Sequence, residues 1–292
     1  MLSILIPTYN TDITALVTSL LDQTREAGVV YELIFCEDAS TLYQEQNSAL
    51  TAQPYVRALI NKTNLGRTAT RSKLAKNAQY DWLLFLDADV LIDNDQFIKN
   101  YLTALPSGDF IIVGGTSYVD IPPKNKELRW KYGIKREAKN AEIRMENPSY
   151  IISQNILVKK EVFINLNIVE SRRYGLDNIF SYQIYHQKIN VLHVDNPIVH
   201  TGLEENLIFL DKSLQAIDTL IHYERSGSVS RDFTSLQQAY QKLKKLCLDF
   251  LYPTIFSLFK LGIQNNIVSN RPSLFLFDLF RLNYYIKSRK NA

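Results

Sequence analysis

Residues 82–89 read Trp-Leu-Leu-Phe-Leu-Asp-Ala-Asp, so five large apolar residues run directly into two carboxylates. An apolar run this short and unbroken predicts a strand that is buried on both faces of a sheet. In open α/β sheets, ligands bind just beyond the carboxyl ends of such strands. Asp87 and Asp89 stand at that end, and alternation along an extended chain would point both side chains to the same side. The stretch therefore predicts a ligand site beyond a central strand.

Two carboxylates at the end of a buried strand are costly unless something offsets their negative charge. A hard divalent cation does so, with phosphate oxygens completing its ligand shell. A solvated loop that carries two aspartates by chance is the alternative, because an Asp-x-Asp pattern is short. The choice between the two depends on the rest of the chain.

The composition is that of a globular protein. The chain has 292 residues, of which 46% are hydrophobic and 22% are charged, which argues against a disordered or fibrous protein. This length can bury one substantial core plus an appendage or a small second domain. Cys36 and Cys247 are too few and too far apart in sequence for a disulfide framework or a zinc site. Their scarcity indicates a reducing compartment.

Apolar runs in the sequence are short. The run at residues 4–6 is too short for a signal peptide and has no basic region before it. The longest apolar segment, residues 246–263, is interrupted by Asp249, Pro253 and Lys260, whereas a spanning helix needs about 20 apolar residues. We therefore expect a cytoplasmic protein, either soluble or peripheral at the inner face of the membrane.

Strands alternate with helices along the first 220 residues. Such alternation predicts βαβ units and an α/β fold with a Rossmann-like, mostly parallel central sheet flanked by helices. Right-handed crossovers then bring the loops at Tyr9, Asp38 and Asp89 to one edge of the sheet. We expect strands at 2–6, 31–36, 56–60, 82–86, 110–113, 151–158 and 191–194, and helices at 12–26, 43–52, 68–79, 94–104, 177–187 and 204–223.

Two segments break this rhythm. Residues 226–230, Ser-Gly-Ser-Val-Ser, read as a linker, which predicts a domain at 1–224 and a helical C-terminal extension at 225–292. Residues 120–148 are rich in Lys, Arg and Glu with interleaved aromatic residues, a mixture that can indicate nucleic-acid binding. A solvated helix or a flexible loop over the site explains this segment as well, and we favour that interpretation.

The C-terminal segment is basic and apolar at once. Residues 238–292 contain nine Lys/Arg against two Asp/Glu, so the preceding part of the chain is mildly acidic. Apolar side chains with basic neighbours can lie in a membrane interface. Core packing and a homodimer face are the alternatives for such an aromatic stripe, and all three stay open.

Six short motifs occur in a fixed order along the chain. Together they resemble the inverting family 2 glycosyltransferases, which have the GT-A fold, over about residues 1–215. The motifs are Pro7-Thr8-Tyr9-Asn10, Glu37-Asp38-Ala39-Ser40, Asn64-x-Gly66 with Arg71, Asp87-Ala88-Asp89, Asp177 at the head of a helix, and His200.

The resemblance implies a binding site for the donor nucleotide. The loop after the first strand holds the base, with Tyr9 available to pack on it, and Asp38 accepts a hydrogen bond from a base N–H. The usual pair at 37–38 is Asp-Asp, so Glu37 departs from the family pattern. The implied nucleotide-binding residues are Pro7, Thr8, Tyr9, Asp38, Asn64, Arg67, Arg71 and Asp87.

The resemblance also implies a metal site and a catalytic base. Asp89 and His200 match the ligands of a Mn²⁺ or Mg²⁺ ion, and Asp177 matches the second acid of a Glu-Asp pair that supplies the general base. Leu176 stands where the first acid is expected, and an N-terminal helix cap is the structural alternative for Asp177. The resemblance assigns contacts with the donor sugar or the acceptor to Gln154 and Asn155.

We therefore expect a metal-dependent, inverting glycosyltransferase. It would move a sugar from a nucleotide-diphosphate donor, taken as a UDP-sugar, to a hydroxyl of a glycan or lipid-linked acceptor, with no nucleic-acid partner. A catalytically inactive nucleotide-sugar-binding or interaction protein is the alternative, to which the missing acid at Leu176 gives weight. A nucleotidyltransferase is disfavoured, because no Gly-rich loop with a phosphate-binding Lys follows the first strand.

Overall fold

The computed structural model describes residues 1–105, 110–166 and 173–291 and divides the chain into two compact units. The boundary that the linker predicts at 224/225 lies inside the second unit. Unit 1 comprises Met1–Val119, Glu137–Arg172 and Gln183–Gly202, and unit 2 comprises Asp120–Arg136, Arg173–Tyr182 and Leu203–Ala292.

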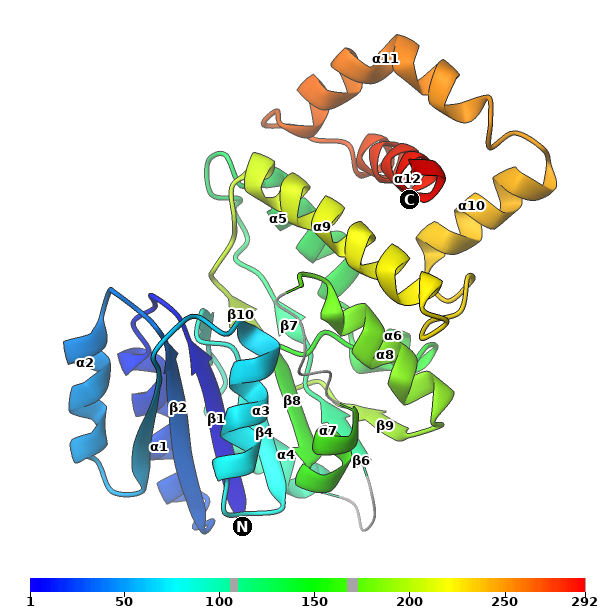
Figure 1. The fold of residues 1–292 in the computed structure, drawn as a ribbon. Helices are drawn as coiled ribbons and strands as arrows, with labels where there is room; N and C mark the ends of the chain where they lie inside the picture. Colours follow the sequence, from blue (N-terminus) through cyan, green and yellow to red (C-terminus); the bar gives the residue numbers. More distant parts are fainter. Residues whose placement is uncertain (106–109, 167–172, 292) are drawn as a thin grey trace. The chain divides into compact units, whose positions relative to one another are not determined.

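Unit 1 is built on a seven-stranded sheet with the order β3-β2-β1-β4-β8-β6-β9 (Figure 1). Strand β8 runs antiparallel to both of its neighbours, and the other pairings are parallel. The mostly parallel sheet expected from the sequence is confirmed. Its strands are β1 Leu2–Thr8, β2 Tyr31–Asp38, β3 Val56–Asn61, β4 Trp82–Leu86, β6 Phe110–Val113, β8 Asn155–Lys159 and β9 Asn190–His193.

Helices cover both faces of this sheet (Figure 1). On one face, helices α1 (Thr14–Glu26) and α4 (Phe97–Ala104) share a core with Leu84 of β4. On the other face lie α3 (Arg67–Asn77) and α7 (Lys160–Leu166), where the rings of Phe85 and Phe163 pack with centroids 4.4 Å apart. Successive residues of β4 thus point to opposite layers, and both are fully buried, as the apolar run predicts.

The strand register brings three strand ends to one edge. Strands β1, β2 and β4 are parallel, so Thr8, Asp38 and Leu86 end at the same side of the sheet. Because β8 is antiparallel, its first residue, Asn155, pairs with Leu86 at that edge. The strand expected at 151–158 therefore begins four residues later than predicted, and the residues before it form a turn.

A second, three-stranded sheet lies in unit 1 and was not expected from the sequence. Its order is β5-β10-β7, with β5 at Val90–Leu91, β10 at Ile198–His200 and β7 at Thr116–Ser117. Strands of two or three residues are too short to give a periodic pattern. This sheet pairs His200 with Val90, directly after Asp89.

The remaining elements of unit 1 are short or shared with unit 2. They are α2 Gln44–Ala49, the 3₁₀ turn Leu50–Ala52, α6 Ala141–Met145, the π-helical turn Gly133–Glu137 that ends in unit 1, and α8 Leu176–His186, which begins in unit 2 and ends in unit 1.

Unit 2 is helical. The favoured interpretation of residues 120–148 as a solvated helix or loop is wrong for α5, because Leu128 is fully buried and Arg129 is 6% exposed. Leu128 packs with Phe209, Phe256 and Phe277 in one apolar cluster. Besides the first turns of α8, its helices are α5 Glu127–Tyr132, α9 Asn206–Arg225, α10 Ser235–Lys245, α11 Tyr252–Ile267 and α12 Leu274–Asn291.

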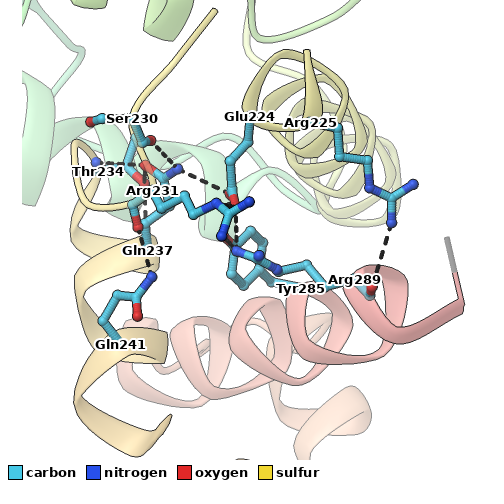
Figure 2. Close-up of polar contacts among 9 residues, drawn as sticks. All are labelled: Glu224, Arg225, Ser230, Arg231, Thr234, Gln237, Gln241, Tyr285 and Arg289. Carbon is cyan, nitrogen blue, oxygen red and sulfur yellow. Dashed lines mark hydrogen bonds and ion pairs between the residues drawn. The ribbon is translucent and has the colours of Figure 1, made fainter. Parts of the chain in front are cut away.

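A buried carboxylate ties three of these helices together (Figure 2). Glu224 of α9 is 5% exposed and accepts hydrogen bonds from Tyr285 (2.5 Å) and Gln237 (3.1 Å). The Arg289 guanidinium pairs with the same carboxylate, and Thr234 and Gln237 form a capping box at the start of α10. The charge of Glu224 is therefore offset inside unit 2, and α9, α10 and α12 are linked through it.

Across the described ranges, no helix combines the length and the apolar character that are needed to cross a bilayer.

Candidate active site

Two arginines of α3 hold the first carboxylate after β4. Arg71 Nη2 donates to Asp87 Oδ1 (2.8 Å), and Arg67 contacts both carboxylate oxygens (3.1 Å from Nε to Oδ1, 3.0 Å from Nη2 to Oδ2). The Arg71 side chain is 6% exposed, whereas that of Arg67 is 39% exposed. Two guanidinium groups face one carboxylate, so the cluster keeps an excess positive charge. Such a cluster suits an anion such as phosphate.

Ser153 joins the two arginines, and sequence reasoning missed it. Its hydroxyl accepts from Arg71 Nη1 (2.7 Å) and from Arg67 Nη2 (2.9 Å). Its carbonyl oxygen accepts a further hydrogen bond from Arg71 Nη2 (2.5 Å). A serine in a turn carries no sequence signal of its own. Only the antiparallel course of β8, which brings residues 153–155 to the edge where β4 ends, identifies it.

Asp38 fixes the start of the arginine-bearing helix. Its carboxylate accepts from the backbone N–H groups of Leu65 and Gly66 and from the Asn61 amide, each at 2.8 Å. Gly66 has φ 84°, a conformation that residues with a Cβ rarely adopt. A carboxylate offers about four acceptor positions, so Asp38 keeps acceptor capacity for a further N–H donor.

Asp89 and His200 form a separate pair beside this cluster. Asp89 Oδ2 lies 3.4 Å from His200 Nε2, and the His200 ring packs edge-on against Tyr118 with centroids 5.7 Å apart. The Asp89 carbonyl accepts from Thr201 through its N–H (3.0 Å) and its hydroxyl (2.9 Å). Gly202 lies so close to Asp89 that an added Cβ would come within 1.7 Å of Oδ2. The two carboxylates of residues 87–89 thus have different partners.

The electrostatic surroundings keep Asp89 ionised. Burial by itself raises the pKa of the Asp89 carboxyl, but the hydrogen bond from His200, a backbone hydrogen bond and the nearby Arg67 guanidinium outweigh burial and lower that pKa. A carboxylate oxygen next to an imidazole nitrogen is a donor set for a divalent cation. The described residues contain no cluster of three or more His, Cys, Asp or Glu that could hold a metal ion. Two protein ligands therefore suit an ion that takes its other ligands from phosphate and water.

The loop after β1 presents one exposed aromatic ring. Thr8 is buried and Pro7 is half-buried, whereas Tyr9 is 53% exposed. The neighbouring Glu37 is buried and accepts hydrogen bonds from Ser40 and from Asn47 Nδ2 (2.7 Å). Glu37, the departure from the family pattern, therefore supports the loops at this edge through its own hydrogen bonds.

Gln154 and Asn155 differ in how far the polar atoms of their side chains are already hydrogen-bonded within the protein. Asn155 is 1% exposed, accepts from the Tyr101 hydroxyl (2.6 Å) and donates to the carbonyls of Gly115 and Asn196 (2.9 Å each). Its amide is thus engaged within the protein. The Gln154 Oε1 atom is buried and has no hydrogen-bond partner among the described residues. Buried polar atoms are normally paired, so this oxygen is the better candidate for a ligand contact.

Two predicted residues remain, one in each unit. Asn64 is half-buried in the loop before α3. Asp177 stands in the first turn of α8, within unit 2, and Leu176 before it is 8% exposed. Leu176 therefore serves as a packing residue at the position where the resemblance implies an acid.

Two comparisons based on sequence agree with this geometry. A family model described as "Glycosyl transferase family 2" matches residues 3–166, which is more than half of the chain. An uncharacterized glycosyltransferase of Haemophilus influenzae is 36% identical over 94 residues. That match covers 30% of this chain and 29% of the relative, so the aligned region is less than a third of the relative's length.

Solved structures share the fold. The mannosyltransferase PcManGT of Pyrobaculum calidifontis, crystallised with GDP-Man and Mn²⁺, has a TM-score of 0.61 at 13% identity, over 99% of this chain and 86% of that chain. S. aureus TarS 1-349 has a TM-score of 0.51 at 15% identity, over 99% and 90%. Glucosyl-3-phosphoglycerate synthase of Mycobacterium tuberculosis, solved with Mn²⁺ and UDP, has a TM-score of 0.51 at 15% identity, over 75% and 78%. The fold is that of GT-A glycosyltransferases, and the family match shows that the chain belongs to glycosyltransferase family 2.

Proposed function

We propose that the protein is a metal-dependent, inverting glycosyltransferase that uses a nucleotide-diphosphate sugar, taken as a UDP-sugar. The acceptor is a hydroxyl group of a glycan or of a lipid-linked saccharide. The single observation that carries the proposal is the edge of the sheet in unit 1. There the Asp89–His200 pair stands beside two arginines that share one aspartate. The first group suits a divalent cation and the second suits a phosphate anion, which together match a metal-bound diphosphate.

The residues of this edge have distinct tasks in the proposal. Asp89 and His200 would hold a Mn²⁺ or Mg²⁺ ion, and such an ion would supply Lewis-acid stabilisation of the charge on the leaving diphosphate. Arg67 and Arg71 add positive charge toward the same group. Asp87 orients both guanidiniums through the hydrogen bonds described above.

The nucleoside binds along the neighbouring loops. The exposed ring of Tyr9 offers a flat surface on which a base can stack. Asp38 accepts a hydrogen bond from a base N–H, beside Pro7, Thr8 and Asn64. The Oε1 atom of Gln154, for which the described ranges offer no hydrogen-bond partner, is assigned to a hydroxyl of the donor sugar.

Transfer itself requires a base on the acceptor. In the proposal, the Asp177 carboxylate takes the proton of the acceptor hydroxyl as its oxygen attacks the anomeric carbon. The bond between that carbon and the diphosphate oxygen breaks, and the leaving nucleotide carries the electron pair. Attack from the side opposite the leaving group inverts the anomeric configuration.

The test is release of UDP from a panel of UDP-sugars, with glycan and lipid-linked acceptors supplied as extracts. We expect Asp177→Asn to lower turnover by about 100-fold or more while leaving UDP affinity unchanged. Asp211→Asn on α9 of the same unit is a matched control for loss of one carboxylate and should behave as wild type. Equal turnover by Asp177→Asn and wild type would exclude Asp177 as the general base.

A nucleotide-sugar-binding protein without catalysis is the second candidate. Leu176 favours it, because this buried apolar residue stands where the family pattern has an acid. In that case UDP and metal bind, no sugar is transferred, and Asp177→Asn changes neither result.

A further inference from the structure

One face of unit 2 is apolar and exposed. It comprises the segment between α10 and α11 together with one side of α11. Leu258 is 78% exposed and Phe259 is 62% exposed, and Leu246 and Phe250 are exposed to similar degrees. Monomeric soluble proteins rarely expose large contiguous apolar patches without a partner for them. We call the exposed apolar side chains within residues 246–262 the α11 face.

A groove runs along the same helix. Its volume is about 510 Å³, and residues of α11 and α12 line it. These two helices pack against each other in unit 2, where Figure 1 labels both. The hydroxyl of Tyr252, the polar side chain of its lining, already donates to the carbonyl of Leu279 (3.0 Å). The groove therefore offers hydrocarbon contact rather than hydrogen bonds. Residues of α11 at i, i+3, i+4 and i+7 line it together with α12: Ile255, Leu258, Phe259, Gly262, Leu276 and Leu279.

Lysines flank the α11 face. Lys242, Lys244 and Lys245 are exposed in the last turn of α10, and Lys260 is exposed on α11. Across residues 242–261 the single acidic residue is Asp249. Exposed apolar side chains bordered by an excess of positive charge complement a surface that has hydrocarbon below a layer of negative headgroups.

We propose that the α11 face docks on a membrane surface that contains anionic lipids. Its apolar side chains enter the headgroup–acyl boundary, a lipid hydrocarbon chain occupies the groove, and the lysines pair with lipid phosphates. A second copy of the chain fits less well. In a two-fold interface each face meets itself, which would bring the four lysines of one copy toward those of the other. The inference goes beyond the proposed transfer reaction and does not depend on it.

The test is vesicle flotation of the full chain, with vesicles of phosphatidylcholine alone or mixed with phosphatidylglycerol. Cys247 provides a second readout. It is exposed, while Cys36 is buried, so an environment-sensitive thiol dye labels Cys247 next to the α11 face. We expect binding to the mixed vesicles with a shift of the dye emission to the blue. Binding to phosphatidylcholine alone should be at least tenfold weaker.

Three variants separate the contributions. Leu258→Glu should abolish flotation, whereas Leu207→Glu, which replaces a leucine 65% exposed on α9, should float as wild type. Each lysine near an anionic surface contributes roughly fivefold in affinity, so replacing Lys242, Lys244 and Lys245 by Gln should weaken binding by about 100-fold. Metal-dependent UDP binding, measured on the same samples, should be equal in all variants. Failure of UDP binding, which concerns the proposed function, is thereby distinguished from failure of flotation, which concerns the docking surface.

Two results would overturn the inference. One is flotation that does not depend on anionic lipid or on Leu258. The other is no flotation of the wild type with the mixed vesicles. A dimer in solution that Leu258→Glu converts to a monomer would then assign the face to a second copy.

Discussion

Replacement of Gly202 by Ala tests whether Asp89 holds the cation. An alanine Cβ at this position would lie 1.7 Å from Asp89 Oδ2, 2.5 Å from its Cγ and 2.7 Å from its Cβ. The backbone at Gly202 is held close to the backbone at Asp89, because the Asp89 carbonyl accepts two hydrogen bonds from Thr201 and because His200 pairs with Val90. The side chain of Asp89 must therefore turn away.

The size of the effect follows from this geometry. To reach an ordinary contact distance, Oδ2 must move by about 2 Å, whereas ligand distances at a metal site tolerate about 0.2 Å. Loss of supporting residues around a metal site typically costs 10–100-fold in affinity, and here the ligand itself is displaced. We expect Gly202→Ala to weaken metal-dependent UDP binding by about 100-fold or more, and we expect the same loss for Asp89→Ala. The overpacking should cost about 1–3 kcal/mol of folding free energy.

The assay is isothermal titration of UDP with and without Mn²⁺. Gly262→Ala is the matched control, because its added Cβ meets no described heavy atom within 4 Å beyond its chain neighbours and the backbone of its own helix, and it should bind as wild type. Circular dichroism checks that Gly202→Ala is folded. If the folded variant binds UDP with Mn²⁺ as tightly as wild type, the assignment of Asp89 to the cation is refuted.

Three further predictions concern other parts of the chain. Ser153→Ala removes a hydrogen-bond acceptor that Arg67 and Arg71 share. In the same titration, UDP affinity in the presence of Mn²⁺ should fall by roughly tenfold, which corresponds to about 1.4 kcal/mol. Unchanged affinity would contradict a role for this serine. Burial raises the pKa of Glu32, but hydrogen bonds from Gln79, Ser3 and Arg57 outweigh it and hold that pKa below the ordinary 4.5. The stabilisation from ionised Glu32 is therefore present above about pH 4.5 and is lost as the pH falls through the pKa of Glu32 in the folded protein. The melting temperatures of wild type and Glu32→Gln should therefore differ at pH 6 and converge in acid. Glu224→Gln breaks a buried ion pair with Arg289 and should lower the free energy of unfolding of unit 2, measured by urea denaturation, by about 3 kcal/mol. A loss below about 1 kcal/mol would contradict a stabilising role for the contacts of Glu224.

The order of elements in unit 1 was predictable from the sequence because its strands are short apolar runs between helices. The buried run at 82–86 coincides with β4, and its end marks the edge where Asp38 and Asp87 lie. The parallel arrangement then follows from chain connectivity. The antiparallel β8 did not follow, since an apolar run carries no information about strand direction. Ser153 was missed for that reason.

Two features depend on contacts between distant segments. His200 was assigned by resemblance, and its place beside Asp89 comes from strands of two and three residues that no periodicity reveals. The basic and aromatic segment at 120–148 looked solvated, yet Leu128 of α5 is in the core of unit 2, because α5 packs against α9 and α12. Burial of a short helix depends on neighbours that lie far along the chain.

The most direct measurement is the melting temperature of wild type and Asp89→Ala with UDP, with Mn²⁺ and with both. A ligand at 100 times its dissociation constant stabilises the folded state by about 2.7 kcal/mol, which for a chain of this size raises the melting temperature by several degrees. We expect this rise for wild type only when UDP and Mn²⁺ are both present, and none for Asp89→Ala. A rise of equal size in Asp89→Ala, or none in wild type, would contradict a metal-bound nucleotide at this edge of the sheet.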